Sequence, residues 1–282
     1  MILKAPGKIN LAINVLEKRD DGYHNVDMIS VPIGLHDHVE ITELVQGNET
    51  FLTCDDIELV CDESNLALKA YKAMQENFQI KKPYRIEIYK RIPIEAGLAG
   101  GSADAAAVIK AVAHYHKPTI SLERLLEVGE TVGSDVPFCL LNKPCRVQGR
   151  GEILTPIKIK ENYHVLIVKP KKGLSTKVVY ERADLIEKVH PNIDLLIKGL
   201  EEGNEKIIAE NMINSLQNAA IEMCPDVREI ILSLKQMGFD MCSMSGSGSA
   251  CFALSKDVKA LQYASKFFAS KGYLTYLTSF NI

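Results

Sequence analysis

The fold prediction for this chain depends on the stretch PIEAGLAGGSADAAAVIKAVAHY, residues 93–115. Gly97, Gly100 and Gly101 stand directly before Ser102 and an alanine-rich segment that is typical of a helix. Glycine permits backbone angles and close approaches that a side chain forbids. The first N–H groups of a helix are unpaired and carry a partial positive charge. A glycine-rich loop that leads into a helix therefore predicts an anion site, most often a phosphate site.

Two common phosphate-binding motifs are excluded. The motif G-x-x-x-x-G-K-[ST] requires a lysine after the last glycine, where this chain has Ser102, and the spacing is not G-x-G-x-x-G either. A flexible turn, capped by Ser102 before a buried helix, explains the glycines equally well. This stretch alone leaves both interpretations open.

The composition is that of a globular protein. The chain has 282 residues, 46% of them apolar and 24% charged, and a formal net charge of −3. Such a protein has no electrostatic reason to bind nucleic acid or an anionic membrane, and no apolar run reaches the roughly 18 residues of a membrane helix. The N-terminus lacks the apolar core of a secretory signal. Seven scattered cysteines without a Cys-x-x-Cys pair indicate reduced thiols in a cytoplasmic protein, and neither a disulfide framework nor a zinc site.

The periodicity of apolar residues predicts an α+β chain. Alternation predicts strands and helical spacing predicts helices. In the first half we expect strands at residues 8–16, 39–43 and 85–90, a charged hairpin turn at 18–22, and a helix at 65–75 with caps among residues 62–64. In the second half we expect a strand from residue 164, helices at 207–223 and 226–237, two short strands around Gly246 and Gly248, a helix at 257–271 and a strand at 273–280. This second order is the split βαβ of a ferredoxin-like domain. We also expect a strand around residues 150–154. We place the domain boundary after this strand, so that the two domains comprise residues 1–157 and 158–282.

Two further stretches contain charged residues in apolar surroundings. In KAPGKINLAINV, residues 4–15, Lys8 follows Pro6 and Gly7 within a strand pattern, where a lysine is most often a solvated edge residue. In VGSDVPFCL, residues 132–140, Asp135 is placed to cap a short helix. The apolar run after Asp135 also indicates partial burial, where a carboxylate needs a partner.

Three motifs in order resemble the GHMP kinases over nearly the whole chain. They are APGKINL at residues 5–11, the phosphate-loop pattern P-x-x-x-G-L-x-G-G-S-[SA]-[DN]-A at 93–105, and MSGSGSACFAL at 244–254. The resemblance implies a two-domain α+β fold, with an N-terminal domain like the second domain of ribosomal protein S5 and a ferredoxin-like C-terminal domain. It also implies ATP-dependent phosphoryl transfer to an alcohol. Glu95, Ala96 and Ala99 stand where some members of the family have glycine.

The resemblance implies a catalytic pair and an ATP loop. Asp135 would accept the proton of the alcohol, and Lys8 beside it would keep that carboxylate ionised. Asn65 would contribute either to the adenosine pocket or to a helix cap. The residues expected to wrap the phosphates of ATP are Pro93, Ile94, Glu95, Ala96, Gly97, Leu98, Ala99, Gly100, Gly101, Ser102 and Ala103.

Residues 8–26 and 132–140 further resemble those family members that phosphorylate a cytidine diphosphate-linked alcohol in isoprenoid precursor biosynthesis. Tyr23 would stack on the cytosine, His24 would hydrogen-bond to it, and Tyr180 would cover its second face. Because Tyr23 and Tyr180 come from different halves of the chain, the base site is expected between the domains. The other implied contacts to this substrate are Asn10 at the alcohol, Thr176 near Tyr180, and Gly246 and Gly248, either at the transferred phosphate or in a plain tight turn.

Several alternatives stay open. Mg²⁺ is expected with ATP, but its ligands are unassigned, with Asp104 and Glu130 as candidates. The partners are small molecules, and the chain could be a monomer or a homodimer. The rival functions are a family kinase acting on homoserine or a mevalonate-type alcohol, and a non-catalytic sensor of the same fold. Such a sensor should have lost the charged pair, whereas Lys8 and Asp135 are both present.

Overall fold

The structure, a computed structural model, describes residues 1–45, 49–116 and 119–282. Its packing divides the chain into two compact units, each built from several segments. The first unit comprises Met1–Gly7, Leu35–Ile94 and Ala99–Asn142, and the second comprises Lys8–Gly34, Glu95–Leu98 and Lys143–Ile282. Because these units interleave along the chain, a single boundary after residue 157 stays a prediction.

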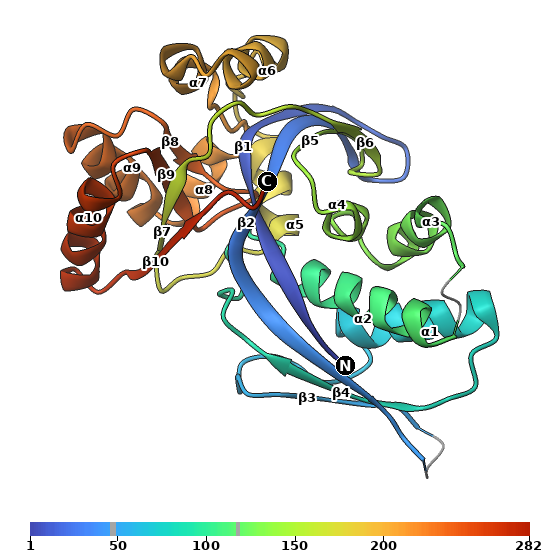
Figure 1. Cartoon of the computed structure of the whole chain (residues 1–282). Coiled ribbons are helices and arrows are strands. Elements are labelled where there is room, and N and C mark those ends of the chain that lie inside the picture. Colours follow the sequence, from blue (N-terminus) through green and yellow to red (C-terminus); the bar gives the residue numbers. More distant parts are fainter. Residues whose placement is uncertain (46–48, 117–118) are drawn as a thin grey trace. The chain divides into compact units, whose positions relative to one another are not determined.

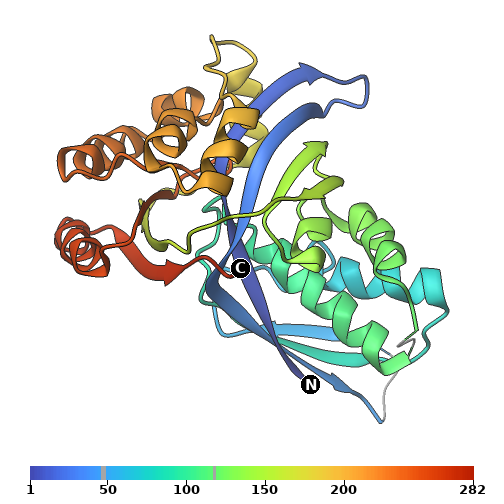
Figure 2. The same ribbon diagram turned by 45° about the horizontal axis from the view of Figure 1, so that its top comes forward.

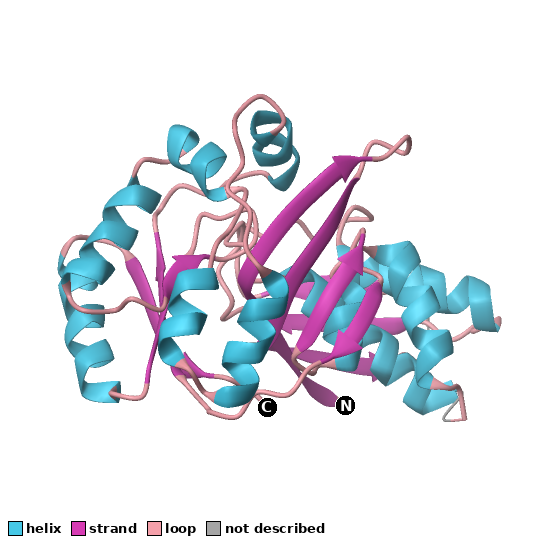
Figure 3. Cartoon of the chain, turned by 90° about the horizontal axis from the view of Figure 1, so that it is seen from above, coloured by secondary structure: helices cyan, strands magenta, loops and turns pink. Residues whose placement is uncertain are grey.

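The chain begins with a long hairpin, of which residues Lys8–Gly34 belong to the second unit. Strands β1 (Ile2–Lys18) and β2 (His24–Glu43) pair with each other, and Figures 2 and 3 show these two longest strands side by side up to their turn. The predicted turn is confirmed, since the N–H of Arg19 donates to the carbonyl of Tyr23 at 2.7 Å. Strand β2 pairs antiparallel with β5 (Cys145–Gly149), which pairs with β6 (Ile153–Pro156).

The second unit also contains a four-stranded antiparallel sheet in the order β10-β7-β9-β8. This order confirms the ferredoxin-like arrangement of the C-terminal half. Helices α9 and α10 pack against this sheet (Figure 1). The strands are β7 (His164–Lys169), β8 (Cys242–Met244), β9 (Cys251–Ser255) and β10 (Leu274–Ser279). The helices are α5 (Thr176–Ala183), α6 (Ile193–Glu202), α7 (Glu205–Asn211), α8 (Gln217–Met223), α9 (Asp226–Gln236) and α10 (Val258–Ser270).

Two predicted elements of this unit are wrong in detail. The helix expected over residues 207–223 is divided into α7 and α8, because Asn214 leaves the helical path. Its Nδ2 donates to the carbonyls of Met244 and Gly246, both at 2.8 Å, and its backbone bridges to Ile13. The strand expected around residues 150–154 is instead the turn between β5 and β6 and the start of β6, where Gly151 has a φ of 131° that other residues rarely adopt.

The first unit places helices against strands β3 (Phe51–Cys54) and β4 (Tyr84–Tyr89). Strand β4 pairs antiparallel with the end of β2 and parallel with β3. Figure 1 shows α1 (Leu66–Phe78) and α2 (Gly100–His116) side by side next to these strands. Helices α3 (Leu122–Val132) and α4 (Val136–Leu141) complete the unit. The predicted strand and helix near residues 85–90 and 65–75 are thereby confirmed.

Small residues allow α2 to be buried on nearly all sides. Ala103, Ala106 and Ala107 of α2 and Ala67 and Ala70 of α1 are each at most 3% exposed, and α1 is a close neighbour of α2 along its length. Larger side chains would force these helix axes apart, since interiors are packed to crystal-like density. The alanine run therefore holds the start of α2, with the end of the glycine loop, in a fixed place within the unit.

A buried ionic cluster lies beneath the start of α2. The Nζ of Lys90 lies 2.5 Å from Oδ2 of Asp37 and 2.9 Å from Oδ2 of Asp104, a residue of the first turns of α2. Oδ1 of Asp37 also accepts hydrogen bonds from the N–H groups of Arg91 and Ile92. Burial raises the pKa of the Asp104 carboxyl to about 7, although the Lys90 ammonium opposes this. One lysine thus holds two carboxylates and ties β4 to α2.

We expect Lys90→Met to destabilise the protein by about 3–5 kcal/mol, because removing one partner of a buried ionic cluster leaves uncompensated charge. Denaturant unfolding monitored by circular dichroism measures this loss. Lys82→Met is the matched control: Lys82 pairs with Glu43 with 57% of its side chain exposed, and such a pair contributes at most about 1 kcal/mol. Equal effects of the two substitutions would contradict the structural role of Lys90.

Candidate active site

The second unit brings together parts of the three motifs. Oγ of Ser245 accepts a hydrogen bond from the N–H of Asn10 at 3.2 Å and donates one to the carbonyl of Gly97 at 2.9 Å. The N–H of Lys8 donates to the carbonyl of Leu98 at 3.0 Å. Strand β1, residues 95–98 of the phosphate loop and the C-terminal glycine loop are therefore joined by the hydroxyl of Ser245 and by a backbone hydrogen bond.

Three glycines are required by this packing. Gly97 has a φ of 72°, and a Cβ there would overlap the carbonyl group of Ser245, whose carbon would lie 2.9 Å away. A Cβ on Gly246 would lie 2.8 Å from the carbonyl oxygen of Gly97, and one on Gly248 would lie 2.7 Å from Sδ of Met244. Close backbone approach explains Gly97 and Gly246, and a φ of 86° explains Gly248. A contact of Gly246 or Gly248 with a transferred phosphate stays a prediction.

Lys8 is buried, so its interpretation as a solvated edge residue is wrong. Only 4% of the residue is exposed. Its Nζ donates to Oδ1 of Asn10 at 2.6 Å, and Nδ2 of Asn10 donates to Oγ of Ser30 at 2.9 Å. A buried ammonium requires such hydrogen bonds to offset its lost hydration. This polar chain fixes the amine of Lys8 in position on β1.

The phosphate loop contains two residues with backbone angles that favour glycine. Glu95 has a φ of 51° and Ala99 a φ of 57°. A side chain in this left-handed region costs about 1–2 kcal/mol. The loop therefore has the glycine-type conformation of the motif even where its residues are not glycine.

The start of α2 offers unpaired N–H groups. The first intrahelical hydrogen bond runs from the N–H of Ala103 to the carbonyl of Ala99 at 2.9 Å, so the N–H groups of Gly100, Gly101 and Ser102 precede it. Around a Cβ placed on Gly101, the described chain offers only Leu66, at 3.6 Å. Protein packing alone does not explain why residue 101 is glycine.

Asn65 caps a helix and Asp135 does not. Oδ1 of Asn65 accepts from the N–H of Ala67 at 2.9 Å, and its Nδ2 donates to the carbonyl of Val60 at 2.8 Å. Asn65 itself, and not a residue among 62–64, is thus the cap of α1, while its contact with adenosine stays a prediction. Asp135 occupies the N-cap position of α4, yet its side chain makes no capping hydrogen bond with that helix. The capping role predicted for Asp135 is wrong.

The residues expected at the base lie within one compact unit, contrary to the expectation of a site between two. His24 is 7% exposed, and its ring centroid lies 5.3 Å from that of Tyr180, with 39° between the ring planes. Its Nε2 lies 2.7 Å from Oδ1 of Asp184. Tyr23 is 55% exposed, with the guanidinium of Arg150 5.4 Å from its ring centroid.

Thr176 contacts the C-terminal glycine loop. Its Oγ1 lies 2.9 Å from Oγ of Ser247, a residue that is 6% exposed. Thr176 is the first residue of α5, the helix that carries Tyr180 one turn later. This hydrogen bond ties α5 to the glycine loop within the second unit.

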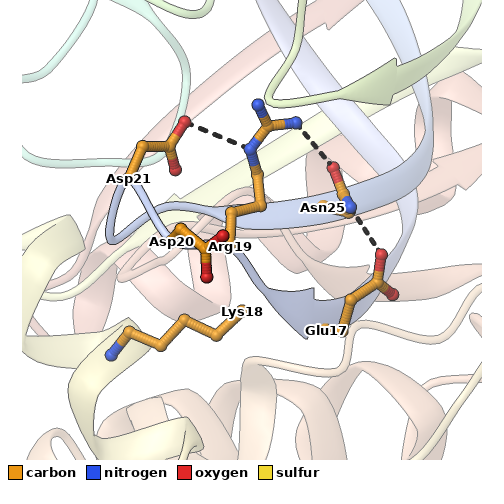
Figure 4. Close-up of a pocket in the computed structure, with 6 residues that line it drawn as sticks. All are labelled: Glu17, Lys18, Arg19, Asp20, Asp21 and Asn25. Atoms are coloured by element: carbon orange, nitrogen blue, oxygen red, sulfur yellow. Dashed lines mark hydrogen bonds and ion pairs between the residues drawn. The ribbon is translucent and has the colours of Figure 1, made fainter.

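The turn before Tyr23 is ordered by its own charged side chains, which line a shallow pocket (Figure 4). Arg19 donates from Nε to Oδ2 of Asp21 and from Nη1 to Oδ1 of Asn25, both at 3.1 Å, and Nδ2 of Asn25 donates to Oε1 of Glu17. Figure 4 shows Lys18 extending away from this chain of contacts. The turn therefore has a defined shape before any ligand binds.

No group of three or more His, Cys, Asp or Glu side chains that could hold a metal occurs in the part of the chain that the structure describes. Asp104 is 1% exposed and paired with Lys90, so it is poorly placed to bind Mg²⁺, and Glu130 stays a prediction.

Sequence reasoning missed two residues of the site, Ser245 and Asp184. The spacing of Asp184 four residues after Tyr180, one helical turn, was a usable signal.

Family comparisons match both halves of the chain. The model of the GHMP kinases N terminal domain matches residues 65–143, and that of the GHMP kinases C terminal domain matches residues 192–273. No helix among the described residues is long and apolar enough to cross a membrane.

Curated relatives and solved structures agree with these matches. The 4-diphosphocytidyl-2-C-methyl-D-erythritol kinases of Clostridium kluyveri and Clostridium botulinum are 39% and 40% identical, each over 93% of both chains. The crystal structure of a 4-(cytidine 5'-diphospho)-2C-methyl-D-erythritol kinase superposes with a TM-score of 0.81 at 27% identity, covering 99% of both chains. A homoserine kinase from Cytophaga hutchinsonii has a TM-score of 0.77 at 18% identity, covering 100% of this chain and 94% of its own, and shares the fold.

Matches to both domain models, together with relatives 39–40% identical over 93% of the chain, establish that this chain belongs to the GHMP kinases.

Proposed function

We propose that the chain transfers the γ-phosphoryl group of ATP to the 2-hydroxyl of 4-diphosphocytidyl-2-C-methyl-D-erythritol, a step of non-mevalonate isoprenoid precursor biosynthesis. The observation that carries this proposal is the 39–40% identity, over 93% of the chain, to relatives that bear the name of this kinase. A cluster of His24, Tyr180 and Asp184 agrees with a nucleobase site. The homoserine and mevalonate kinases share only the fold with this chain, at 16–18% identity.

Residues of the glycine loop bind ATP in this proposal. The unpaired N–H groups at the start of α2 and the partial positive charge there favour the phosphates. The open space beside Gly101, bordered by Leu66 alone among the described residues, would leave the ligand room to approach the backbone. Mg²⁺ would enter with ATP as part of the substrate, since the described side chains form no metal cluster of their own.

Asp135 and Lys8 carry the chemistry in this proposal. The carboxylate of Asp135 accepts the proton of the 2-hydroxyl while that oxygen bonds to the γ-phosphorus, and the bond between this phosphorus and the β–γ bridging oxygen breaks to release ADP. The ammonium of Lys8 stabilises negative charge at the reacting oxygens. Support comes from the buried, hydrogen-bonded amine of Lys8 and from a carboxylate at Asp135 that its helix does not use as a cap.

We expect Asp135→Asn to lower kcat at least about a hundredfold while the KM values for both substrates change less than about threefold, because a lost general base slows the chemical step. Steady-state kinetics measure both constants. Asp194→Asn is a matched control at an exposed ion pair with Arg146. Lys8→Met should also lose turnover, and the double variant should lose less than the product of the two effects if the pair acts as one unit. A near wild-type kcat for Asp135→Asn would remove this residue from the role of base.

Gly101→Val should raise the KM for ATP about tenfold or more, corresponding to roughly 1.4 kcal/mol, and change the KM for the cytidine substrate less than about twofold. Outside its own helix, a Cβ at residue 101 meets only the side chain of Leu66 within 4 Å among the described residues, so in this proposal the added side chain would intrude mainly on the ligand. Thermal unfolding followed by circular dichroism should show a Tm within a few degrees of the wild type. A large fall in Tm, or equal losses for both substrates, would count against binding of the phosphates at this glycine.

Tyr23→Ala should raise the KM for the cytidine substrate about 5- to 150-fold, because stacking of a base on an aromatic ring contributes roughly 1–3 kcal/mol. The KM for ATP should stay within about twofold. Tyr263→Ala, which removes a 71% exposed tyrosine of α10, is the control for loss of surface aromatic area. Turnover of homoserine or mevalonate by the wild type, with no turnover of the cytidine substrate, would favour the rival kinases.

A further inference from the structure

His24 is held by two residues that lie one turn apart at the end of α5. The ring centroid of Tyr180 lies 5.3 Å from that of His24, with the planes tilted by 39°, and Oδ1 of Asp184 lies 2.7 Å from Nε2 of His24. The N–H of Asp184 donates to the carbonyl of Tyr180 at 3.1 Å, so the helical backbone fixes the spacing of the two side chains. All three residues belong to the second unit. The end of α5 thereby sets both the tilt and the rotation of the imidazole ring.

Two lysines keep the carboxylate of Asp184 charged. Nζ of Lys18 lies 3.2 Å from Oδ2, and Nζ of Lys188 lies 3.4 Å from Oδ1. Burial raises the pKa of the Asp184 carboxyl, but hydrogen bonds from Lys18 and His24 outweigh it and hold the pKa below its usual value. Asp184 is therefore an anion that can only accept hydrogen bonds.

An acceptor at Nε2 selects the tautomer of a neutral imidazole ring. A neutral imidazole has one N–H donor and one acceptor nitrogen. Because the carboxylate of Asp184 only accepts, Nε2 of His24 must carry the proton, and Nδ1 becomes the acceptor. Within the described chain a partner is seen for Nε2 and none for Nδ1. Among the described residues, two side-chain polar atoms are fully buried without a hydrogen-bond partner, Oδ1 of Asp104 and the hydroxyl of Tyr163. Nδ1 of His24 is not one of them. The acceptor nitrogen of His24 is thus left for a ligand.

We propose that Asp184 is a positioning residue which, given the proposed function, makes His24 selective for cytosine over uracil. It does so by holding the ring with its proton on Nε2, so that Nδ1 accepts a hydrogen bond from the exocyclic amino group at position 4 of the base. Uracil has a carbonyl oxygen at position 4, which would face the lone pair of Nδ1 and leave two acceptors unpaired. A site built around a hydrogen bond rejects an analogue that lacks the matching group far better than a shape-based site does.

The proposal is tested with two substitutions and one control. Asp184→Ala removes the acceptor, so the ring is free to rotate and to exchange tautomers. Asp184→Asn keeps the shape but replaces one acceptor oxygen by an NH₂ donor. Because Lys18 and Lys188 flank the two oxygens, the amide can present either group to Nε2, and the ring can exchange tautomers. The control is Asp194→Asn, an aspartate of the same unit with 81% of its side chain exposed.

The kinetic measurements are the KM for the cytidine substrate and the inhibition constants of cytidine diphosphate and uridine diphosphate. In the wild type, uridine diphosphate should inhibit at least about tenfold more weakly than cytidine diphosphate, as one lost hydrogen bond predicts. Asp184→Ala should raise the KM for the cytidine substrate about tenfold with kcat and the KM for ATP within about twofold. Asp184→Asn should reduce or abolish the preference between the two diphosphates. An unchanged KM and an unchanged preference in both variants would overturn the proposal.

A second readout does not depend on activity. Ring nitrogen chemical shifts of ¹⁵N-histidine-labelled protein distinguish the two tautomers, and His24→Gln identifies the signals of His24. The wild type and Asp194→Asn should show His24 with its proton on Nε2, and Asp184→Asn should show a mixture of the two tautomers. A mixture of tautomers in the wild type would overturn the positioning role of Asp184. A single tautomer without any binding of cytidine compounds would instead refute the proposed function and, with it, the role of His24 at the base.

Discussion

The hydroxyl of Ser245 is the constraint on which the second unit depends. It accepts from the backbone of Asn10 and donates to the backbone of Gly97, so one buried atom joins three segments that are distant in the sequence. Because Ser245 itself is fully buried, loss of either bond would leave a polar group unpaired at a cost of about 1–3 kcal/mol. The glycines at 97 and 246 follow from this contact, since any side chain there would separate the two loops.

The same contact determines where the amine of Lys8 lies. Residue 10 accepts from Nζ of Lys8 through its side chain while its backbone is fixed by Ser245. Lys8 in turn donates its own N–H to Leu98 of the phosphate loop. The amine that stabilises charge in the proposed reaction is therefore tied, through backbone hydrogen bonds, to residues 97 and 98. A residue buried in this way loses little freedom when substrate binds, which is the benefit of a preorganised site.

The sequence predicted those features that arise locally. The glycine loop before α2, the hairpin turn and the ferredoxin-like order of the second half follow from residue type and periodicity. The interruption between α7 and α8 could not be predicted, because the segment is helical in pattern and only the distant carbonyls of Met244 and Gly246 draw Asn214 away. The burial of Lys8 was missed for the same reason, since its partners include the side chain of Asn10, which is itself held by Ser30. The partnership of Asp184 and His24 spans 160 residues, and its only local signal is the position of Asp184 one helical turn after Tyr180.

The left-handed angles of Glu95 and Ala99 show how such distant contacts override local preference. Each residue has a conformation that costs about 1–2 kcal/mol relative to glycine, yet neither lies in a segment free to relax. Between them, the carbonyls of Ala96, Gly97 and Leu98 accept hydrogen bonds from Ala250, Ser245 and Lys8 respectively. Ala99 also accepts the first hydrogen bond of α2 from Ala103. Strain of this kind persists only where the surroundings over-determine the backbone. The loop thus keeps its left-handed residues because its carbonyl groups, and not its side chains, define the path of the backbone.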